Sequence, residues 1–375
     1  MVRRGGVLPS ALIAVISLPC GYVVYRVVQA IVGWLWIEGP ESWWDGRPPW
    51  IYMLALPVAA GALVYLARSR GGDGHNPLFG ISMEPVSPRD YPSVLAAIVL
   101  SLAGGLVLGP EVAMVSTGSF LGGALGNAWS VPVKRGVMIG AAASLAALLV
   151  DPLFSGQLRI QGVYQFSAWD LPMAAGAGVA TALLLVVVRL GAIGLLRFRG
   201  GDKPRIWQLM VGGLVVGAIA VGYQSASGQK VDLVLTSGET LIAPLVTLGS
   251  ASLIAWTVLA KCAAYAVSLG SGFRGGPYFP AMFAGAGLGA AGAGALGLSA
   301  EPAAIAGVLA GITFLAHAKW SVSLALSLVI AFGLAGPAMV PVALIGGACG
   351  RLIPIPIPRP AEPETADAVG AASQD

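Results

Sequence analysis

Charged residues are scarce in this chain. Asp, Glu, Lys and Arg make up 10% of its 375 residues, whereas hydrophobic residues make up 57%, and the mean hydropathy is +0.82. A typical soluble domain carries about 25% charged residues, so a chain this apolar lacks the polar surface that water requires. Long apolar runs rich in glycine and alanine favour membrane helices over the alternating strands of a barrel. We therefore expect an all-α polytopic membrane protein.

Residues that support catalysis or bind metals are also few. The two histidines, His75 and His317, lie far apart, and the sequence contains no metal-ligand cluster, phosphate-binding loop or nucleophile motif. The three cysteines, Cys20, Cys262 and Cys349, each lie in apolar sequence, which indicates small core residues. We expect no enzymatic activity, no cofactor and no metal. The basic residues lie in short loops, so we expect a lipid bilayer and no nucleic acid as the partner.

The apolar segments are short and interrupted. The chain contains 53 glycines and 26 prolines, and several segments fall short of the roughly 20 residues that a simple span requires. Broken helices are tolerated in a membrane where their free ends face protein or a water-filled cavity, so the pattern predicts the re-entrant half-helices of a transporter or channel. The segments lie at 8–36, 50–67, 92–127, 136–150, 170–196, 207–224, 240–271, 276–298, 302–317, 321–336 and 338–350.

The loops predict the orientation of the chain. The basic segment 197–205 and the N-terminal Arg3 and Arg4 should be cytoplasmic. The acidic loop 37–50 should be external, and the tryptophans in and beside it should form an interfacial belt: Trp34, Trp36, Trp43, Trp44 and Trp50. We expect four regions along the chain: a first membrane repeat at 1–196, a cytoplasmic linker at 197–206, a second membrane repeat at 207–352 and a disordered tail at 353–375.

Two stretches of the first half have counterparts in the second. GPEVAM at 109–114 resembles GPYFPAM at 276–282, and GAAASLAALL at 140–149 more loosely resembles AGVLAGITFLAHA at 306–318. Glycine and alanine are so common in this chain that matches of this length can also arise by chance. An internal duplication with interrupted helices at corresponding places predicts a central substrate site built from helix ends.

Glu111 is the candidate functional residue of the first half. It is the only residue charged at neutral pH between Asp90 and Lys134, and it follows a Gly-Pro pair. Helix N-termini present free N–H groups and a partial positive charge, so several of them pointed inward form an anion site. A glutamate at such a helix start could occupy the anion site and act as a gate. The alternative is a plain N-terminal charge on a helix, but ionisable groups inside membranes are costly and more often functional.

These stretches resemble those of the CLC family of chloride channels and proton-coupled chloride exchangers, over roughly residues 8–350. The GPEVA stretch is similar to the family's GxEGP motif, with Glu111 in the place of the gating glutamate. GPYFP is similar to its GxFxP motif, and GGDGHNP falls where the family has GSGIP. The resemblance implies two inverted repeats, a homodimer with one pathway per subunit, and passage of a small inorganic anion such as chloride. It implies ion-binding positions at Asp73, Gly109, Gly276, Tyr278 and Phe279.

The sequence departs from the family at several of these positions. Asp73 stands in the place of a chloride-coordinating serine, where a fixed carboxylate would repel an anion. Pro110 and Pro277 each remove a backbone N–H from a loop that should donate to the ion. Where the family's exchangers carry an internal proton-relay glutamate, this sequence has Gln161 followed by Gly162. We therefore expect a passive channel in preference to tight proton exchange.

Two other functions remain open at this stage. One is a regulatory or scaffold membrane protein that kept the fold and lost transport, which Asp73 and the two prolines favour. The other is a transporter of a cation or a neutral solute, with Asp73 and Glu111 as ligands. Lys261 and Lys319 are isolated charges in apolar sequence, and we expect them to lie at helix ends and reach the interface. Arg159 could line an inner vestibule or lie in a plain cytoplasmic loop.

Overall fold

The computed structural model of the chain describes residues 6–72, 74–80, 83–150, 167–200, 203, 205–334 and 336–358. Within these ranges the regular structure is helical, as the sequence predicts. Five helical segments are long and apolar enough to cross a membrane. They are Val7–Trp44, in which α1 (Val7–Gly33) continues through a π-helical turn into α2 (Gly39–Trp44), α3 (Trp50–Ser69), α8 (Asp170–Phe198), α9 (Ile206–Ser227) and α11 (Ala251–Gly270).

The other helices are shorter and several of them meet end to end inside the protein. The expected segment 92–127 is broken into α4 and α5, and 240–271 is broken before α11. Their bounds are α4 Tyr91–Ala103, α5 Glu111–Ala128, α6 Val133–Val150, α10 Ile242–Val246, α12 Tyr278–Ala295, α13 Ala300–Ala316, α14 Trp320–Leu334 and α15 Val340–Leu352. A short 3₁₀ helix, η2, spans Pro77–Phe79.

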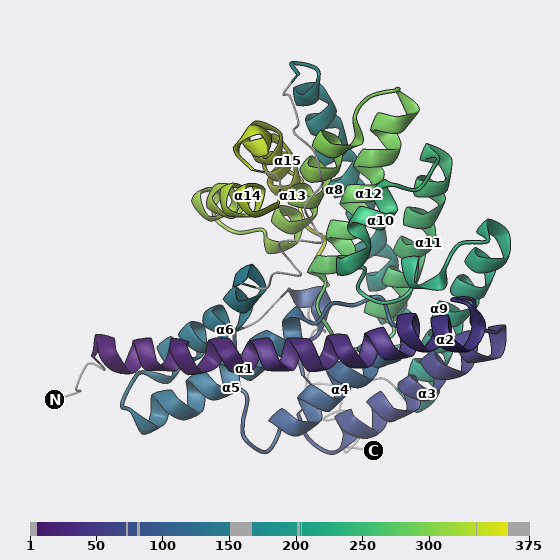
Figure 1. Cartoon of the computed structure of the whole chain (residues 1–375). Coiled ribbons are helices and arrows are strands. Elements are labelled where there is room, and N and C mark those ends of the chain that lie inside the picture. The colour runs from purple at the N-terminus through teal and green to yellow at the C-terminus, as the bar shows by residue number, and fades with distance from the viewer. Residues whose placement is uncertain are drawn as a thin grey trace, which may run out of the picture.

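The helices form two lobes. Figure 1 shows α1 and α3 to α6 in the lower lobe, coloured purple to blue, and α8 and α11 to α15 above it, coloured teal to yellow. Helix α9 lies beside α3 and joins the lobes. This contact depends on glycine in both helices, because a Cβ at Gly61 would meet the backbone of Leu209 and one at Gly213 would meet the backbone of Pro57. Small residues of this kind allow helix backbones to approach closely in lipid.

The two lobes repeat the same packing 167 residues apart, the separation of Glu111 from Tyr278. In the first lobe a Cβ at Gly118 would meet the backbone of Gly140, which holds α5 against α6. In the second lobe Gly285 meets Gly307 in the same way, which holds α12 against α13. The duplication predicted at 109–114 and 276–282 therefore extends through both helix pairs.

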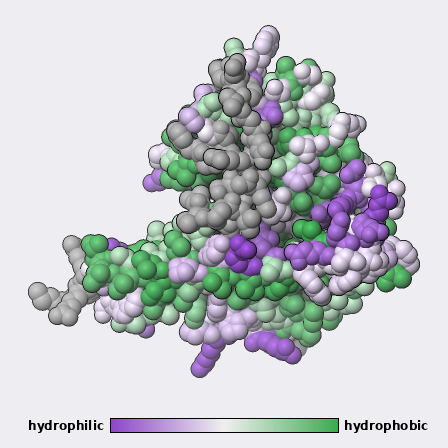
Figure 2. Space-filling model, in the orientation of Figure 1, coloured by the Kyte–Doolittle hydropathy of each residue, from purple (hydrophilic) through white to green (hydrophobic). Residues whose placement is uncertain are grey.

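Four of the five tryptophans expected in the interfacial belt are exposed, and their place at a membrane interface stays a prediction. Trp34, Trp43, Trp44 and Trp50 are between 36% and 60% exposed. Trp36 is 2% exposed, and its Nε1 donates to the carbonyl of Ala103, so its assignment to the belt is wrong. Figure 2 shows hydrophobic residues along most of α1, while hydrophilic residues gather near α2.

The chain after α15 lies against the core for at least its first residues. Pro356 accepts a hydrogen bond from the Arg189 side chain at 2.9 Å, and Pro358 is buried. The disorder expected for 353–375 is therefore not seen in the described residues 353–358. Residues 359–375 lie outside the described ranges.

Candidate ion pathway

The candidate site lies where two broken helices meet. Residues 104–110 separate α4 from α5, and residues 271–277 separate α11 from α12. The two breaks form an antiparallel bridge: Gly109 N donates to Gly276 O at 2.7 Å, and Gly276 N donates to Gly109 O at 2.6 Å. Each break ends in a proline that caps the following helix, namely Pro110 for α5 and Pro277 for α12. Two helix N-termini therefore meet in the interior.

A pair of equivalent serines holds the breaks together. Ser101 Oγ accepts from the Arg274 amide at 3.1 Å, and Ser268 Oγ accepts from the Val107 amide at 3.0 Å. Each serine lies near the end of the helix before one break and binds the backbone of the other break. Both side chains are fully buried. Because buried amides need partners, these bonds fix how the two breaks cross.

The carboxyl group of Glu111 occupies the junction. Its side chain is 2% exposed, and Oε1 accepts from the Tyr278 amide at 2.7 Å. The amide of Phe279 also interacts with this carboxyl group. Glu111 is the first residue of α5, yet its side chain binds the first amides of α12. Its Oε2 is buried without a hydrogen-bond partner among the described residues.

Two glycines leave room for this carboxyl group. A Cβ at Gly109 would meet Glu111 Oε2, and a Cβ at Gly276 would meet the Glu111 carboxyl carbon. Any other residue at either position would therefore occupy the place of the carboxyl group. The bridging glycines form one wall of the Glu111 site, while the N-terminus of α12 supplies its hydrogen-bond donors.

Five of the six predicted site residues come together here. Glu111, Gly109, Gly276, Tyr278 and Phe279 lie within one junction, although the roles assigned to them stay predictions. Tyr278 supplies its amide, and its half-buried hydroxyl makes no hydrogen bond to a described residue.

Four other residues that the sequence analysis singled out lie outside the described ranges: Asp73, Arg159, Gln161 and Gly162. Nothing in the structure therefore bears on the expected anion repulsion by Asp73 or on the relay position.

One cavity approaches Glu111 from the side of α2. It has a volume of about 350 Å³ and is lined by Arg26, Glu38, Ser237 and neighbours. It shares Thr236 and Ser237 with a second cavity of about 10 Å³ that touches Pro110. A space of that size holds about one water molecule. The larger cavity therefore leads toward a narrow space beside Pro110, the residue before Glu111.

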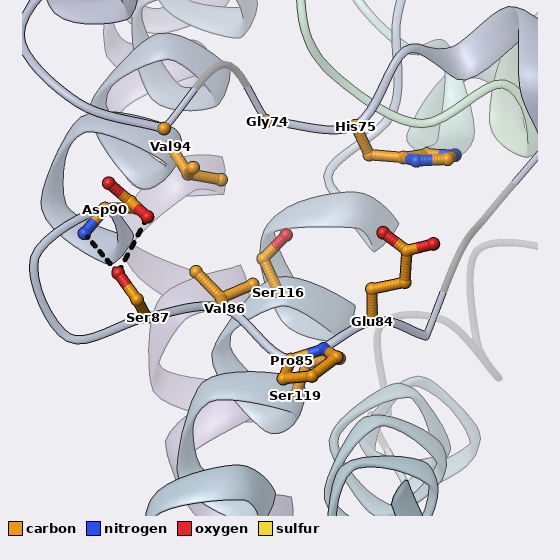
Figure 3. A pocket seen from close by; sticks show the side chains of 11 residues that line it. Gly74, His75, Glu84, Pro85, Val86, Ser87, Asp90, Val94, Ser116 and Ser119 are labelled. Atoms are coloured by element: carbon orange, nitrogen blue, oxygen red, sulfur yellow. Dashed lines mark hydrogen bonds between the residues drawn. The ribbon is translucent and has the colours of Figure 1, made fainter.

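A cavity of about 190 Å³ lies near the opposite end of α3. Figure 3 shows Glu84 and His75 on one side of it and Ser87 with Asp90 on the other, with Ser116 of α5 between them. Ser87 Oγ donates to Asp90 Oδ2 at 2.7 Å. Cavities therefore approach α5 from both ends of α3, and Glu111 lies buried between them.

Arg189 of α8 is a candidate site residue that the sequence reasoning missed. It is 2% exposed, its Nε donates to Pro356 O at 2.9 Å, and its Nη2 donates to Leu78 O at 2.5 Å. It pairs with no carboxylate among the described residues, and it interacts electrostatically with Tyr278. Arg189 is the only charged residue between Asp170 and Arg197. The same signal that singled out Glu111 could have found it.

The expectation for Lys261 was wrong. It lies in the middle of α11, is 1% exposed and does not reach an interface. Its Nζ lies 4.5 Å from the centre of the Phe283 ring. The ammonium also donates to four consecutive carbonyls at 3.0–3.3 Å, those of Leu233, Val234, Leu235 and Thr236. Lys261 therefore fixes the loop that lines the cavity above Pro110.

Comparison with known proteins identifies the family. The family model described as "Voltage gated chloride channel" matches residues 132–324. The chain belongs to this family. Its members are ion channels and transporters rather than enzymes, so the chain is an integral membrane protein with the CLC fold. The predicted fold class and family are confirmed.

Relatives and solved structures agree with this assignment. The Escherichia coli protein named "Putative ion-transport protein YfeO" is 27% identical over 328 residues, which cover 75% of this chain and 77% of YfeO. A slow cyanobacterial Cl⁻/H⁺ antiporter superposes with a TM-score of 0.70 at 16% identity, covering 92% of this chain and 93% of its own. A CLC-type fluoride/proton antiporter gives 0.67 at 18% identity, covering 92% and 94%. At these identities the two structures show the fold alone.

Proposed function

We propose that the protein passes a small inorganic anion, chloride or similar, through the membrane and that Glu111 is the gate. One observation carries the proposal: the Glu111 carboxyl group occupies the free N-terminus of α12, accepting from the Tyr278 amide at 2.7 Å. A helix N-terminus is a ready anion site, because its N–H groups point outward and the dipole favours negative charge. An anion that takes the place of the carboxyl group would find the same donors.

The gate works by competition between the side chain and the anion. While Glu111 occupies the site, the cavities on either side of it stay separated. When the carboxyl group is protonated it loses its negative charge and leaves, and an anion enters between Gly109 and Gly276. The Tyr278 hydroxyl, which makes no hydrogen bond to a described residue, would then donate to that anion.

Arg189 supplies the fixed charge of this pathway. A buried guanidinium with no carboxylate partner is costly, and an anion nearby offsets that cost. Its electrostatic interaction with Tyr278 supports a position near the junction. A permanent positive charge there would compensate for the two amides that Pro110 and Pro277 cannot supply.

The family to which the chain belongs suggests its assembly, and the basic residues suggest its orientation in the membrane. We propose a homodimer with one pathway in each subunit, in a cell membrane. The exposed basic residues Arg197, Lys203 and Arg205 mark the cytoplasmic face, together with the N-terminus. The cavity beside α2 is then the external entrance, and the one lined by Glu84 and Asp90 is the internal entrance.

A proton or another cation is the second candidate substrate. The internal cavity is lined by Glu84, Asp90 and His75, which suit a cation better than an anion. The two solved structures with the same fold are a Cl⁻/H⁺ antiporter and a fluoride/proton antiporter. Proton coupling in this chain would require a route other than the relay glutamate, because Gln161 and Gly162 stand in that place.

Flux from proteoliposomes tests the proposal. Vesicles are loaded with chloride, fluoride or nitrate, and efflux is started with a potassium ionophore. We expect at least one anion to leave well above the rate from empty vesicles. A parallel experiment measures proton uptake against an imposed chloride gradient. Proton uptake would show that the protein is an exchanger and not a channel. If none of the three anions leaves the vesicles, anion passage is contradicted.

A further inference from the structure

A pocket lies between three helices, next to the basic segment 197–205. Its volume is about 170 Å³, and its walls are mainly apolar. Leu195 and Phe198 of α8, Val211 and Val215 of α9 and Val267 of α11 form these walls. The pocket lies where α8 and α11 end and α9 begins. An apolar space of this kind between membrane helices is suited to an acyl chain.

Basic and aromatic residues stand close in sequence to those that line the pocket. Arg197, Lys203 and Arg205 are exposed in the segment that joins α8 to α9, beside the lining residues Phe198 and Trp207. Phe198 is 89% exposed and Trp207 is 52% exposed, so two aromatic side chains project beside the charges. Aromatic residues favour the headgroup level of a membrane, and clustered Lys and Arg at a helix end attract anionic lipids.

The pocket wall is connected to the ion pathway. Arg199 lines the pocket, and its Nη1 donates to Ser271 O at 3.0 Å. Arg68 donates to the next carbonyl, that of Gly272, at 2.7 Å. A Cβ at Gly272 would collide with the Arg199 guanidinium, so this turn fits tightly around it. The same turn continues to Gly276 and the Glu111 site.

We propose that this pocket binds an anionic phospholipid, with an acyl chain against α8, α9 and α11 and the phosphate on the exposed basic residues of the segment between α8 and α9. An apolar cavity alone would accept any lipid. The three exposed cations give the preference for a negatively charged headgroup, and the cavity distinguishes a bound lipid from a free phosphate. This lipid site does not depend on which ion the protein moves.

Native mass spectrometry and lipid-dependent thermal stability test the lipid site. The full chain is released from micelles supplied with phosphatidylglycerol or phosphatidylcholine, and retained lipid is counted. We expect phosphatidylglycerol to be retained and to raise the midpoint of unfolding, while soluble glycerol phosphate does neither. Each basic residue contributes roughly fivefold in affinity, so the double variant Lys203→Gln/Arg205→Gln should retain phosphatidylglycerol roughly thirtyfold more weakly.

Two further variants separate a pocket from general surface charge. Val215→Phe partly fills the cavity and should weaken retention while leaving the charges of the basic segment intact. Lys134→Gln/Arg135→Gln removes two exposed charges at the start of α6, away from the pocket, and should leave retention unchanged. Equal retention of both lipids by the unaltered protein would overturn the proposal. So would an equal loss in the Lys134/Arg135 variant.

Discussion

The two repeats of this protein share a backbone and differ in the side chain at its centre. Gly109-Pro110 in the first break matches Gly276-Pro277 in the second, and Ser101 and Ser268 make reciprocal bonds across them. The next residue differs, since α5 begins with Glu111 and α12 begins with Tyr278.

This difference makes the site asymmetric. If both repeats began with a carboxylate, two like charges would meet at the junction, and one would leave the site or stay protonated. If neither did, the helix ends would have no internal anion to occupy them. With one acid and one tyrosine, the acid of the first repeat occupies the helix end of the second. The symmetric backbone forms the site, and we propose that the asymmetric residue controls it.

Substitution of a glycine of the bridge should disturb the Glu111 site most strongly. Gly276→Ala places a methyl group where the Glu111 carboxyl carbon lies, which is also where the anion would enter, so it should obstruct the site and lower anion flux by about tenfold or more, the effect of roughly 1.4 kcal/mol. Gly292→Ala, inside the following helix α12 and with no atom near its added Cβ, is the control. Flux from vesicles containing matched amounts of folded protein is the measurement. Equal flux in both variants would contradict the assigned position of the gate.

Arg189 tests whether a fixed charge supports the asymmetric site. Arg189→Gln keeps a hydrogen-bonding side chain and removes the charge, so we expect flux to saturate at about tenfold higher anion concentration. The exposed Arg135→Gln serves as the control and should leave the concentration dependence unchanged. A variant that lowers maximal flux without moving the half-saturating concentration would assign Arg189 a structural role only.

The two serines offer a matched pair of substitutions whose expected effect is on stability. Ser101→Ala leaves the Arg274 amide without its acceptor, and Ser268→Ala does the same to the Val107 amide. Each should cost about 1–3 kcal/mol of stability, because a buried amide loses its partner. Thermal unfolding followed in detergent should show similar downward shifts for both. A shift in only one variant would show that the two breaks are not held equivalently.

Much of the fold was accessible from the sequence because membrane helices must be apolar along their length. The apolar segments gave most helix bounds within a few residues, and the short GPEVAM and GPYFPAM matches located both helix breaks. Glu111 could be found because a single charge in an apolar segment is costly. Arg189 had the same signature in α8 and was passed over, since no motif accompanied it.

The remaining errors concern residues whose partners are distant in sequence. Lys261 resembled an interfacial lysine, because nothing near it in the chain indicates that residues 233–236 supply four carbonyls. Trp36 resembled its exposed neighbours for the same reason, since its partner is Ala103. Tertiary contacts of this kind leave no local periodicity in the sequence.

The pH dependence of anion flux in Glu111→Gln tests the central claim most directly. The amide keeps the size of the side chain and its ability to accept from Tyr278, but it cannot gain or lose a proton over the range in which proteins fold. Flux by the unaltered protein should rise as the pH falls, and flux by Glu111→Gln should be independent of pH. An unchanged pH profile in the variant would contradict the assignment of Glu111 as the gate.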